Sequence, residues 1–200
     1  MQDLTGFRVA IIAGDAFEQS ELTEPLNALK KAGADVSVVA PHPGEIQGVK
    51  HDQKGKKIKV DKTFADLRPK DYDGVQLPGG ALNADSIRMQ PELQEFLRAM
   101  QAAGKPMAVI CHAPWELISA GLANGRRMTS YYTIQDDVRN AGAEWLDEAV
   151  VTDDNLITSR SPQDLPQFNA AMIKLFAQSQ GKGTPYKPGR KQRRQAEATA

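Results

Sequence analysis

The residue with the clearest chemical potential is Cys111, the only cysteine among 200 residues. It follows the short apolar run 107–110, which predicts a buried strand. Pro114 and the segment 115–121, which ends in glycine, predict a helix directly after it. Cys111 is therefore expected on a strand-to-helix turn, the geometry of a nucleophile elbow, where unpaired N–H groups and the helix dipole lower a thiol pKa. The alternative is a buried cysteine that acts as a small hydrophobic residue.

His112 follows the cysteine directly. Adjacent side chains on a helix do not face each other, so His112 is not automatically a base for Cys111. The other histidines, His42 and His51, both precede the cysteine, which excludes a triad that needs a later histidine, as in class I glutamine amidotransferases. Three scattered histidines and one cysteine have no metal-ligand spacing, so we expect neither a metal site nor a cofactor.

Two further segments follow predicted strands. Glu18 lies just past the first strand, and its carboxyl could hydrogen-bond the cysteine sulfur if burial raises its pKa. On position alone we favour the alternative, a carboxylate at a helix N-terminus. Gly79 and Gly80 follow another strand and could offer N–H groups to a developing oxyanion, although a plain turn is equally consistent with a glycine pair. The segment lacks the G-x-G-x-x-G spacing of a dinucleotide site.

Alternating strand and helix patterns predict an α/β sandwich over a mostly parallel sheet. Pro25 must lie in the first turn of its helix or bend it. The carboxyl ends of parallel strands meet at one edge, so segments 15–18, 79–80 and 111–112 are expected to converge on one site. The expected strands are 7–13, 35–40, 74–78 and 107–110, and the expected helices are 21–32, 91–100, 115–120, 133–141 and 165–177. Segment 49–60 is expected to form a hairpin or exposed edge strands, and 149–159 a hairpin.

Composition describes a soluble globular chain with a formal net charge of +0. We expect one domain over residues 1–180 and a basic, disordered tail over 181–200. A solvated tail without a partner is favoured over a nucleic-acid role for its basic residues, which are Lys187, Arg190, Lys191, Arg193 and Arg194. The sequence shows no signal peptide and no membrane span, and a single reactive cysteine fits a reducing cytoplasm.

Four sequence motifs carry a resemblance to a known family. They are Asp15-Ala-Phe-Glu-Gln-Ser-Glu-Leu22, Leu77-Pro-Gly-Gly80, Ala108-Val-Ile-Cys-His-Ala-Pro114, and Asn140-Ala-Gly-Ala-Glu-Trp145 with Leu156-Ile-Thr-Ser-Arg-Ser-Pro-Gln-Asp-Leu165. With these motifs the chain resembles the DJ-1/PfpI superfamily, most closely its branch of intracellular-protease-like, general stress and deglycase proteins. The resemblance covers about residues 7 to 177 and implies a flavodoxin-like three-layer sandwich.

The resemblance also implies roles for individual residues. Cys111 resembles the family's elbow nucleophile, and Glu18 resembles the protonated glutamate that hydrogen-bonds its sulfur. His112 resembles a histidine that a carboxylate from a second subunit orients, and Asp85 stands at that acid position. The resemblance thus implies a homodimer or higher oligomer with the site near the interface.

Backbone groups and one aromatic residue complete the implied site. Gly79, Gly80 and Ala113 are expected to bind an oxyanion or substrate, and Tyr131 to border the site. Two departures from the family pattern stand out. Ala113 replaces the usual glycine after the histidine, and Asp85 is shorter than the glutamate of some relatives.

Three functions follow from the resemblance and the cysteine. The first is a stress-response hydrolase whose thiolate attacks glycated or dicarbonyl substrates, such as methylglyoxal and glyoxal, without a cofactor. The second is an intracellular cysteine peptidase, which needs a base close to the thiol. The third is a non-enzymatic redox sensor or chaperone-like stress protein, because an accessible cysteine oxidises readily. The expected partners are a small-molecule or glycated-protein substrate and further copies of the chain, rather than a membrane or nucleic acid.

Overall fold

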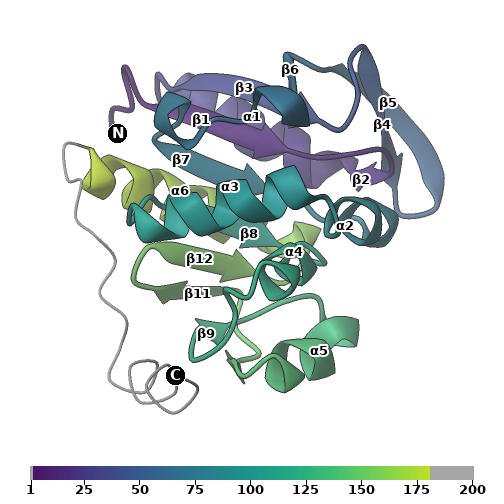
Figure 1. The fold of residues 1–200 in the computed structure, drawn as a ribbon, viewed down its shortest axis with the longest axis vertical. Coiled ribbons are helices and arrows are strands. Elements are labelled where there is room, and N and C mark those ends of the chain that lie inside the picture. The colour runs from purple at the N-terminus through teal and green to yellow at the C-terminus, as the bar shows by residue number, and fades with distance from the viewer. Residues whose placement is uncertain (1, 181–200) are drawn as a thin grey trace.

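The computed structural model describes residues 2–180. A seven-stranded sheet runs through its centre in the order β11-β12-β8-β7-β1-β3-β6 (Figure 1). All neighbouring strands are parallel except the pair β11–β12. The sheet is therefore mostly parallel, as predicted. Its strands are β1 (Arg8–Ile12), β3 (Asp35–Ala40), β6 (Lys62–Thr63), β7 (Gly74–Leu77), β8 (Met107–Ile110), β11 (Val150–Asp153) and β12 (Leu156–Ser159).

Helices cover both faces of this sheet, which gives the three predicted layers (Figure 1). Helices α1 (Gln19–Lys31) and α6 (Leu165–Ser179) lie on one face, and α3 (Pro91–Ala102) lies on the other with α2 (Ala81–Ile87), α4 (Pro114–Ser119) and α5 (Gln135–Asn140) near it. Strand β1 shows how the alternating pattern builds two cores. Ala10 and Ile12 pack toward α3, whereas Val9 and Ile11 pack toward α1 and α6, and all four are fully buried.

Smaller elements frame the carboxyl edge of the sheet. Strands β2 (Phe17–Glu18), β4 (Glu45–Lys50) and β5 (Gln53–Lys59) form a second sheet, in which β4 and β5 make a hairpin. This hairpin begins four residues before the predicted segment 49–60. Strands β9 (Arg127–Met128) and β10 (Glu144–Trp145) form a short parallel pair. Short 3-10 turns occupy Phe64–Asp66, Pro69–Asp71, Tyr132–Ile134 and Pro162–Asp164.

Pro25 lies in the interior of α1, so the first of its two predicted outcomes, a place in the first turn, is wrong. Proline has no N–H, so the carbonyl of Glu21, four residues earlier, loses its helical donor. The buried Gln76 of β7 supplies a replacement, with its Nε2 donating to the Glu21 oxygen at 3.1 Å. This contact ties the first turn of α1 to the central sheet.

The predicted hairpin 149–159 is confirmed by the antiparallel pair β11–β12, and it joins the main sheet because β12 pairs with β8 in parallel. Helix α2 has no counterpart among the predicted elements. The predicted tail, 181–200, and its basic residues lie outside the described residues. Within the part that the structure describes, no helix is long and apolar enough to cross a membrane.

Candidate active site

Cys111 lies between β8 and α4 on the predicted strand-to-helix turn. Its φ of 64° is left-handed, a conformation that costs a non-glycine residue roughly 1–2 kcal/mol. Two backbone hydrogen bonds hold it there. The Cys111 N–H donates to the Ser159 oxygen at 3.0 Å, and the Tyr131 N–H donates to the Cys111 oxygen at 2.8 Å. The left-handed turn thus points the Cys111 side chain in a direction that a residue of a regular helix does not have.

The left-handed turn brings His112 to the thiol. His112 Nδ1 lies 3.2 Å from Cys111 Sγ, so the rule that helical neighbours do not face each other does not apply at this turn. On the far side of the ring, Nε2 lies 3.5 Å from Thr133 Oγ1. Burial lowers the pKa of His112, which keeps the imidazole neutral at pH 7 and leaves a nitrogen lone pair free to accept a proton.

The carboxyl beside the cysteine belongs to Glu21, and the expectation that Glu18 would contact the sulfur is wrong. Glu21 is fully buried in the first turns of α1, within hydrogen-bonding reach of the Cys111 thiol. Its Oε2 accepts a hydrogen bond from Gly79 N–H at 2.8 Å. Glu18 is only half-buried, and its Oε2 accepts instead from the N–H of His51 at 3.0 Å.

Burial explains how Glu21 differs from an ordinary glutamate. Desolvation of the charged form raises the pKa of Glu21 to about 8, against the opposing effect of its hydrogen bonds from Gly79 and Cys111. At neutral pH the carboxyl is therefore mostly protonated. A protonated carboxyl next to a sulfur is a hydrogen-bond donor, which a carboxylate is not.

The resting thiol does not have the lowered pKa that the sequence suggested. Burial, and then the nearby Glu21 carboxyl, raise the pKa of Cys111, although the N–H groups of Gly80 and His112 act in the opposite direction. Helix α4 has only six residues, so its dipole lowers the pKa of the thiol only weakly. The geometry fits a thiol that loses its proton to the neighbouring imidazole during reaction, rather than a permanent thiolate.

The donors available to an oxyanion are fewer than predicted. Gly79 N–H is already bonded to Glu21, and Ala113 N–H donates to the Ile110 oxygen at 3.1 Å. The N–H groups of Gly80 and His112 face the sulfur instead. Ala113 itself has helical angles, φ −60° and ψ −21°, so alanine fits where the family usually has glycine.

Asn83 is a residue at the site that the sequence did not reveal. Its buried side chain accepts from Gly14 N–H at 2.6 Å and donates to the oxygens of Pro78 and Gly79, both at 3.1 Å. Asn83 therefore clamps the loop after β7 to the loop after β1. The loop that it holds is the one that presents Gly80 to the cysteine.

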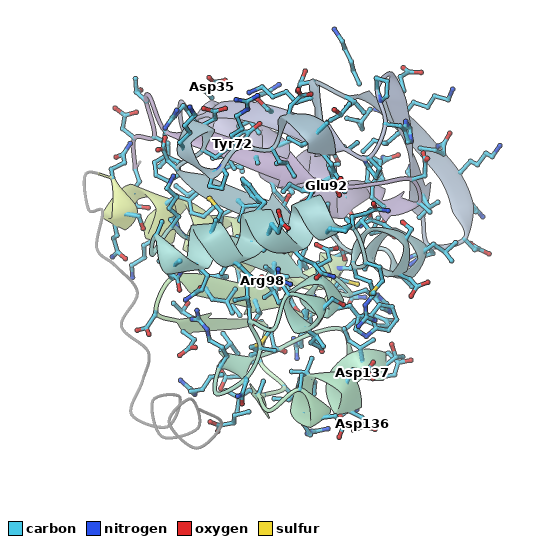
Figure 2. All side chains as sticks on the ribbon, viewed as in Figure 1. Asp35, Tyr72, Glu92, Arg98, Asp136 and Asp137 are labelled. Atoms are coloured by element: carbon cyan, nitrogen blue, oxygen red, sulfur yellow. The ribbon has the colours of Figure 1, made fainter. Side chains whose placement is uncertain are left out.

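Aromatic side chains form one wall of the site. The rings of His112 and Tyr131 stack with centroids 4.7 Å apart, and Tyr132 lies against Tyr131 at 4.8 Å. Trp115 lies 5.5 Å from the histidine ring, and its Nε1 donates to Asp137 at 2.8 Å. Asp137 belongs to α5, which packs against α4 (Figure 2).

One cavity of about 740 Å³ lies at the carboxyl ends of the strands and includes the cysteine and the histidine. Gly79 and Ala113, which were also predicted at the site, are not among its lining residues. The three predicted segments contribute Ala16, Glu18, Gly80, Cys111 and His112, so their convergence is as expected. The remaining lining residues are Glu21, Val49, His51, Asp52, Ala81, Leu82, Tyr131, Tyr132, Asp147, Arg160, Ser161, Pro162 and Gln163. The volume is typical of small-molecule sites.

Asp85 does not join this cavity within one chain. It is exposed on α2, and no contact within residues 2–180 links it to His112. Among the same residues, no group of three or more histidine, cysteine, aspartate or glutamate side chains is arranged to hold a metal ion.

Comparison with known proteins agrees with this geometry. Residues 7–175 match the model of the DJ-1/PfpI family. The chain is 40% identical to deglycase PfpI of Pyrococcus furiosus over 169 residues, which are 84% of this chain and 99% of the relative. It is 37% identical to general stress protein 18 of Bacillus subtilis over 172 residues, 86% of this chain and 98% of the relative.

Among solved structures, Drosophila melanogaster DJ-1beta superimposes with a TM-score of 0.79 at 27% identity, covering 86% of this chain and 90% of that one. The sequence comparison and the structural comparison thus point to the same group of proteins. This agreement accompanies the sheet order, the elbow and the buried glutamate beside the cysteine. The chain belongs to the DJ-1/PfpI family.

Proposed function

We propose that this chain is a cofactor-independent, cysteine-dependent stress-response hydrolase of the PfpI type that converts dicarbonyl or glycated compounds, with methylglyoxal and glyoxal as its simplest substrates. The observation that carries the proposal is the 3.2 Å approach of His112 Nδ1 to Cys111 Sγ at the base of the cavity. A cytoplasmic location fits this chemistry, since the reaction needs a reduced thiol.

The first step uses the thiol and the imidazole. His112 Nδ1 takes the proton of Cys111 while the sulfur attacks the aldehyde carbon, forming a C–S bond and moving the carbonyl electron pair onto oxygen. The N–H groups of Gly80 and His112 lie beside the sulfur and stabilise the developing oxyanion. Protonation of that oxygen gives a hemithioacetal.

The second step is an internal redox exchange. The aldehyde C–H proton moves through a base to the neighbouring carbonyl carbon by way of an enediol, so the former aldehyde is oxidised to a thioester and the ketone is reduced to an alcohol. Water then attacks the thioester carbon, and the thiol of Cys111 leaves with a proton. Methylglyoxal plus water yields lactate, and glyoxal plus water yields glycolate, with no external oxidant or reductant.

Self-association belongs to the same proposal. Leu82 on α2 and Met89, two residues beyond its end, leave 72% and 68% of their surface exposed, and Asp85 lies between them in the sequence. Exposed apolar side chains of this size favour burial against a partner, and Leu82 also borders the cavity. We propose that a second copy covers this face and brings its Asp85 to His112, whose Nε2 faces only Thr133 in the single chain at 3.5 Å.

The experiment that tests the function measures consumption of methylglyoxal and glyoxal, with lactate and glycolate as products. Cys111→Ser should abolish turnover, and Glu21→Ala should reduce it more than the matched change Glu18→Ala, because only Glu21 reaches the sulfur. Turnover that survives Cys111→Ser would refute the thiol mechanism. Absence of product from the fully reduced protein would favour the redox-sensor alternative, and peptide cleavage under the same conditions the peptidase alternative.

A further inference from the structure

The charged side chains that line the cavity are unequal in sign. Three carboxylates, Glu18, Asp52 and Asp147, stand against one guanidinium, that of Arg160. No lysine belongs to the described lining. A cavity with low-dielectric walls concentrates the field of such groups at the place where a substrate enters.

The positive charge of Arg160 is neutralised by two neighbouring carboxylates. Its Nη1 donates to Asp147 Oδ1 at 2.8 Å, and its Nε and Nη2 donate to both oxygens of Asp164 at 2.9 and 3.0 Å. One guanidinium thus serves two carboxylates, and the trio as a whole is negative. An anionic substrate group would have to compete with both aspartates for the remaining N–H donors.

The other two carboxylates have no cationic partner among residues 2–180. Within this range Glu18 accepts from two neutral donors, the N–H of His51 at 3.0 Å and the Ser20 hydroxyl at 3.4 Å. Asp52, in the turn between β4 and β5, is exposed, and within residues 2–180 neither carboxylate forms an ion pair. The bond from His51 to Glu18 holds this turn against the cavity wall.

The cavity is larger than a small dicarbonyl substrate requires. Glu21 lines the same cavity, and its buried Oε1 has no hydrogen-bond partner among residues 2–180. A three-carbon dicarbonyl bound there fills only a small part of about 740 Å³. The rest of a larger substrate would extend past Glu18 and Asp52.

We propose that this cavity selects carbonyl substrates whose non-reacting end carries a cationic group, an ammonium or a guanidinium, and that Glu18 and Asp52 set this preference. The inference rests on the proposed function for its substrates, but not for the electrostatic selection itself. Glu18, which does not contact the nucleophile, thereby has a role at the other end of the substrate.

The test for substrates uses three para-substituted arylglyoxals that differ in charge. The trimethylammonio compound is cationic, the tert-butyl compound is its neutral isostere, and the carboxy compound is anionic. The kcat/KM ratio of cation to neutral isostere is compared between wild type and the Glu18→Gln, Asp52→Asn double variant, so that the intrinsic reactivity of each aldehyde cancels. We expect a decrease of roughly 2- to 5-fold per carboxylate, and a smaller ratio at high ionic strength.

A second measurement does not require turnover. Cys111 is the only cysteine, so its labelling rate by cationic and anionic alkyl methanethiosulfonates, divided by the rates for a free thiol, reports the potential in the cavity. The cation-to-anion ratio should exceed that of the free thiol and should fall in the double variant. Glu45→Gln, which removes a carboxylate of the same hairpin outside the cavity, is the matched control and should leave the ratio unchanged.

The outcomes separate the two proposals. A cation-to-isostere ratio of kcat/KM that is the same in wild type and in the double variant, with dicarbonyl turnover intact, would overturn the charge selection and leave the proposed function standing. Labelling that favours the cationic reagent, without turnover of any arylglyoxal, would support the selection and overturn the proposed function. A labelling ratio like that of a free thiol, or one unaffected by the double variant, would overturn the selection.

Discussion

Replacement of Glu21 by glutamine tests the buried carboxyl most directly, because the two side chains have the same shape and only one of them titrates. In the folded chain the pKa of Glu21 is about 8, against an ordinary value of 4.5. Between these values the folded state binds a proton that the unfolded state has lost. Stability therefore falls as pH rises from about 4.5 to about 8 and is constant above that, by this group alone.

The size of the effect follows from the width of that window. A one-proton difference changes the free energy of unfolding by about 1.4 kcal/mol per pH unit, which amounts to about 5 kcal/mol over the whole window. Glutamine cannot ionise, so Glu21→Gln should gain stability over wild type by roughly 2–3 kcal/mol between about pH 6 and pH 8. Its amide preserves an acceptor for Gly79 N–H and a donor for the sulfur.

Urea unfolding of both proteins across this pH range measures the difference, and Glu18→Gln serves as the control. Glu18 is only half-buried and accepts from the backbone N–H of His51, so its replacement removes a carboxyl of the same motif and leaves the buried one in place. A stability difference between wild type and Glu21→Gln that is flat with pH would refute the assignment of a protonated Glu21. Equal slopes for the two variants would refute the distinction between the two glutamates.

Two further changes test the packing around the site. In Gly79→Ala the new Cβ would lie 2.6 Å from both Cys111 Cβ and Glu21 Oε2, so the loop must shift; we expect loss of turnover and about 1–3 kcal/mol of destabilisation, measured by activity and thermal unfolding together. Glu116 in α4 is 1% exposed, neither of its oxygens has a hydrogen-bond partner in the described part of the chain, and burial raises its pKa well above 4.5. Its penalty thus grows as pH rises, and Glu116→Gln should stabilise the fold more at alkaline than at acidic pH with turnover preserved; equal gains at both would contradict a neutral Glu116.

The order of the elements could be predicted because each strand and helix carries its own local signal. The apolar run before Cys111 and the proline after it predict the elbow, and Gly33 after a run of helical spacing predicts the end of α1. Helix α2 gives no comparable signal. It has seven residues, begins after a glycine and leaves Leu82 exposed. Its apolar residues therefore do not all lie on one buried face, which is the pattern that predicts a helix from sequence.

The fine geometry of the site could not be predicted because it depends on backbone conformations that local patterns do not encode. Sequence position alone gave no reason for the His112 ring to face the Cys111 sulfur. The φ of 64° at the cysteine brings Nδ1 of the ring to 3.2 Å from the sulfur. Asn83 likewise depends on how its neighbours fold, because its side chain joins Pro78 and Gly79, five and four residues away, to the distant Gly14. The sequence shows that these residues exist but not that their polar groups meet.

The exchange of roles between Glu18 and Glu21 shows where motif and fold diverge. Both glutamates stand in the same motif, one helical turn apart, and both end near the cavity, so residue type and spacing are unable to separate them. What separates them is the start of α1 at Gln19, which leaves Glu18 in β2 and turns Glu21 inward. The proline at position 25 then reinforces this choice, since it frees the carbonyl of Glu21 for Gln76 in the central sheet. Pro25, predicted to lie in the first turn of the helix or to bend it, therefore helps to fix the carboxyl beside the cysteine.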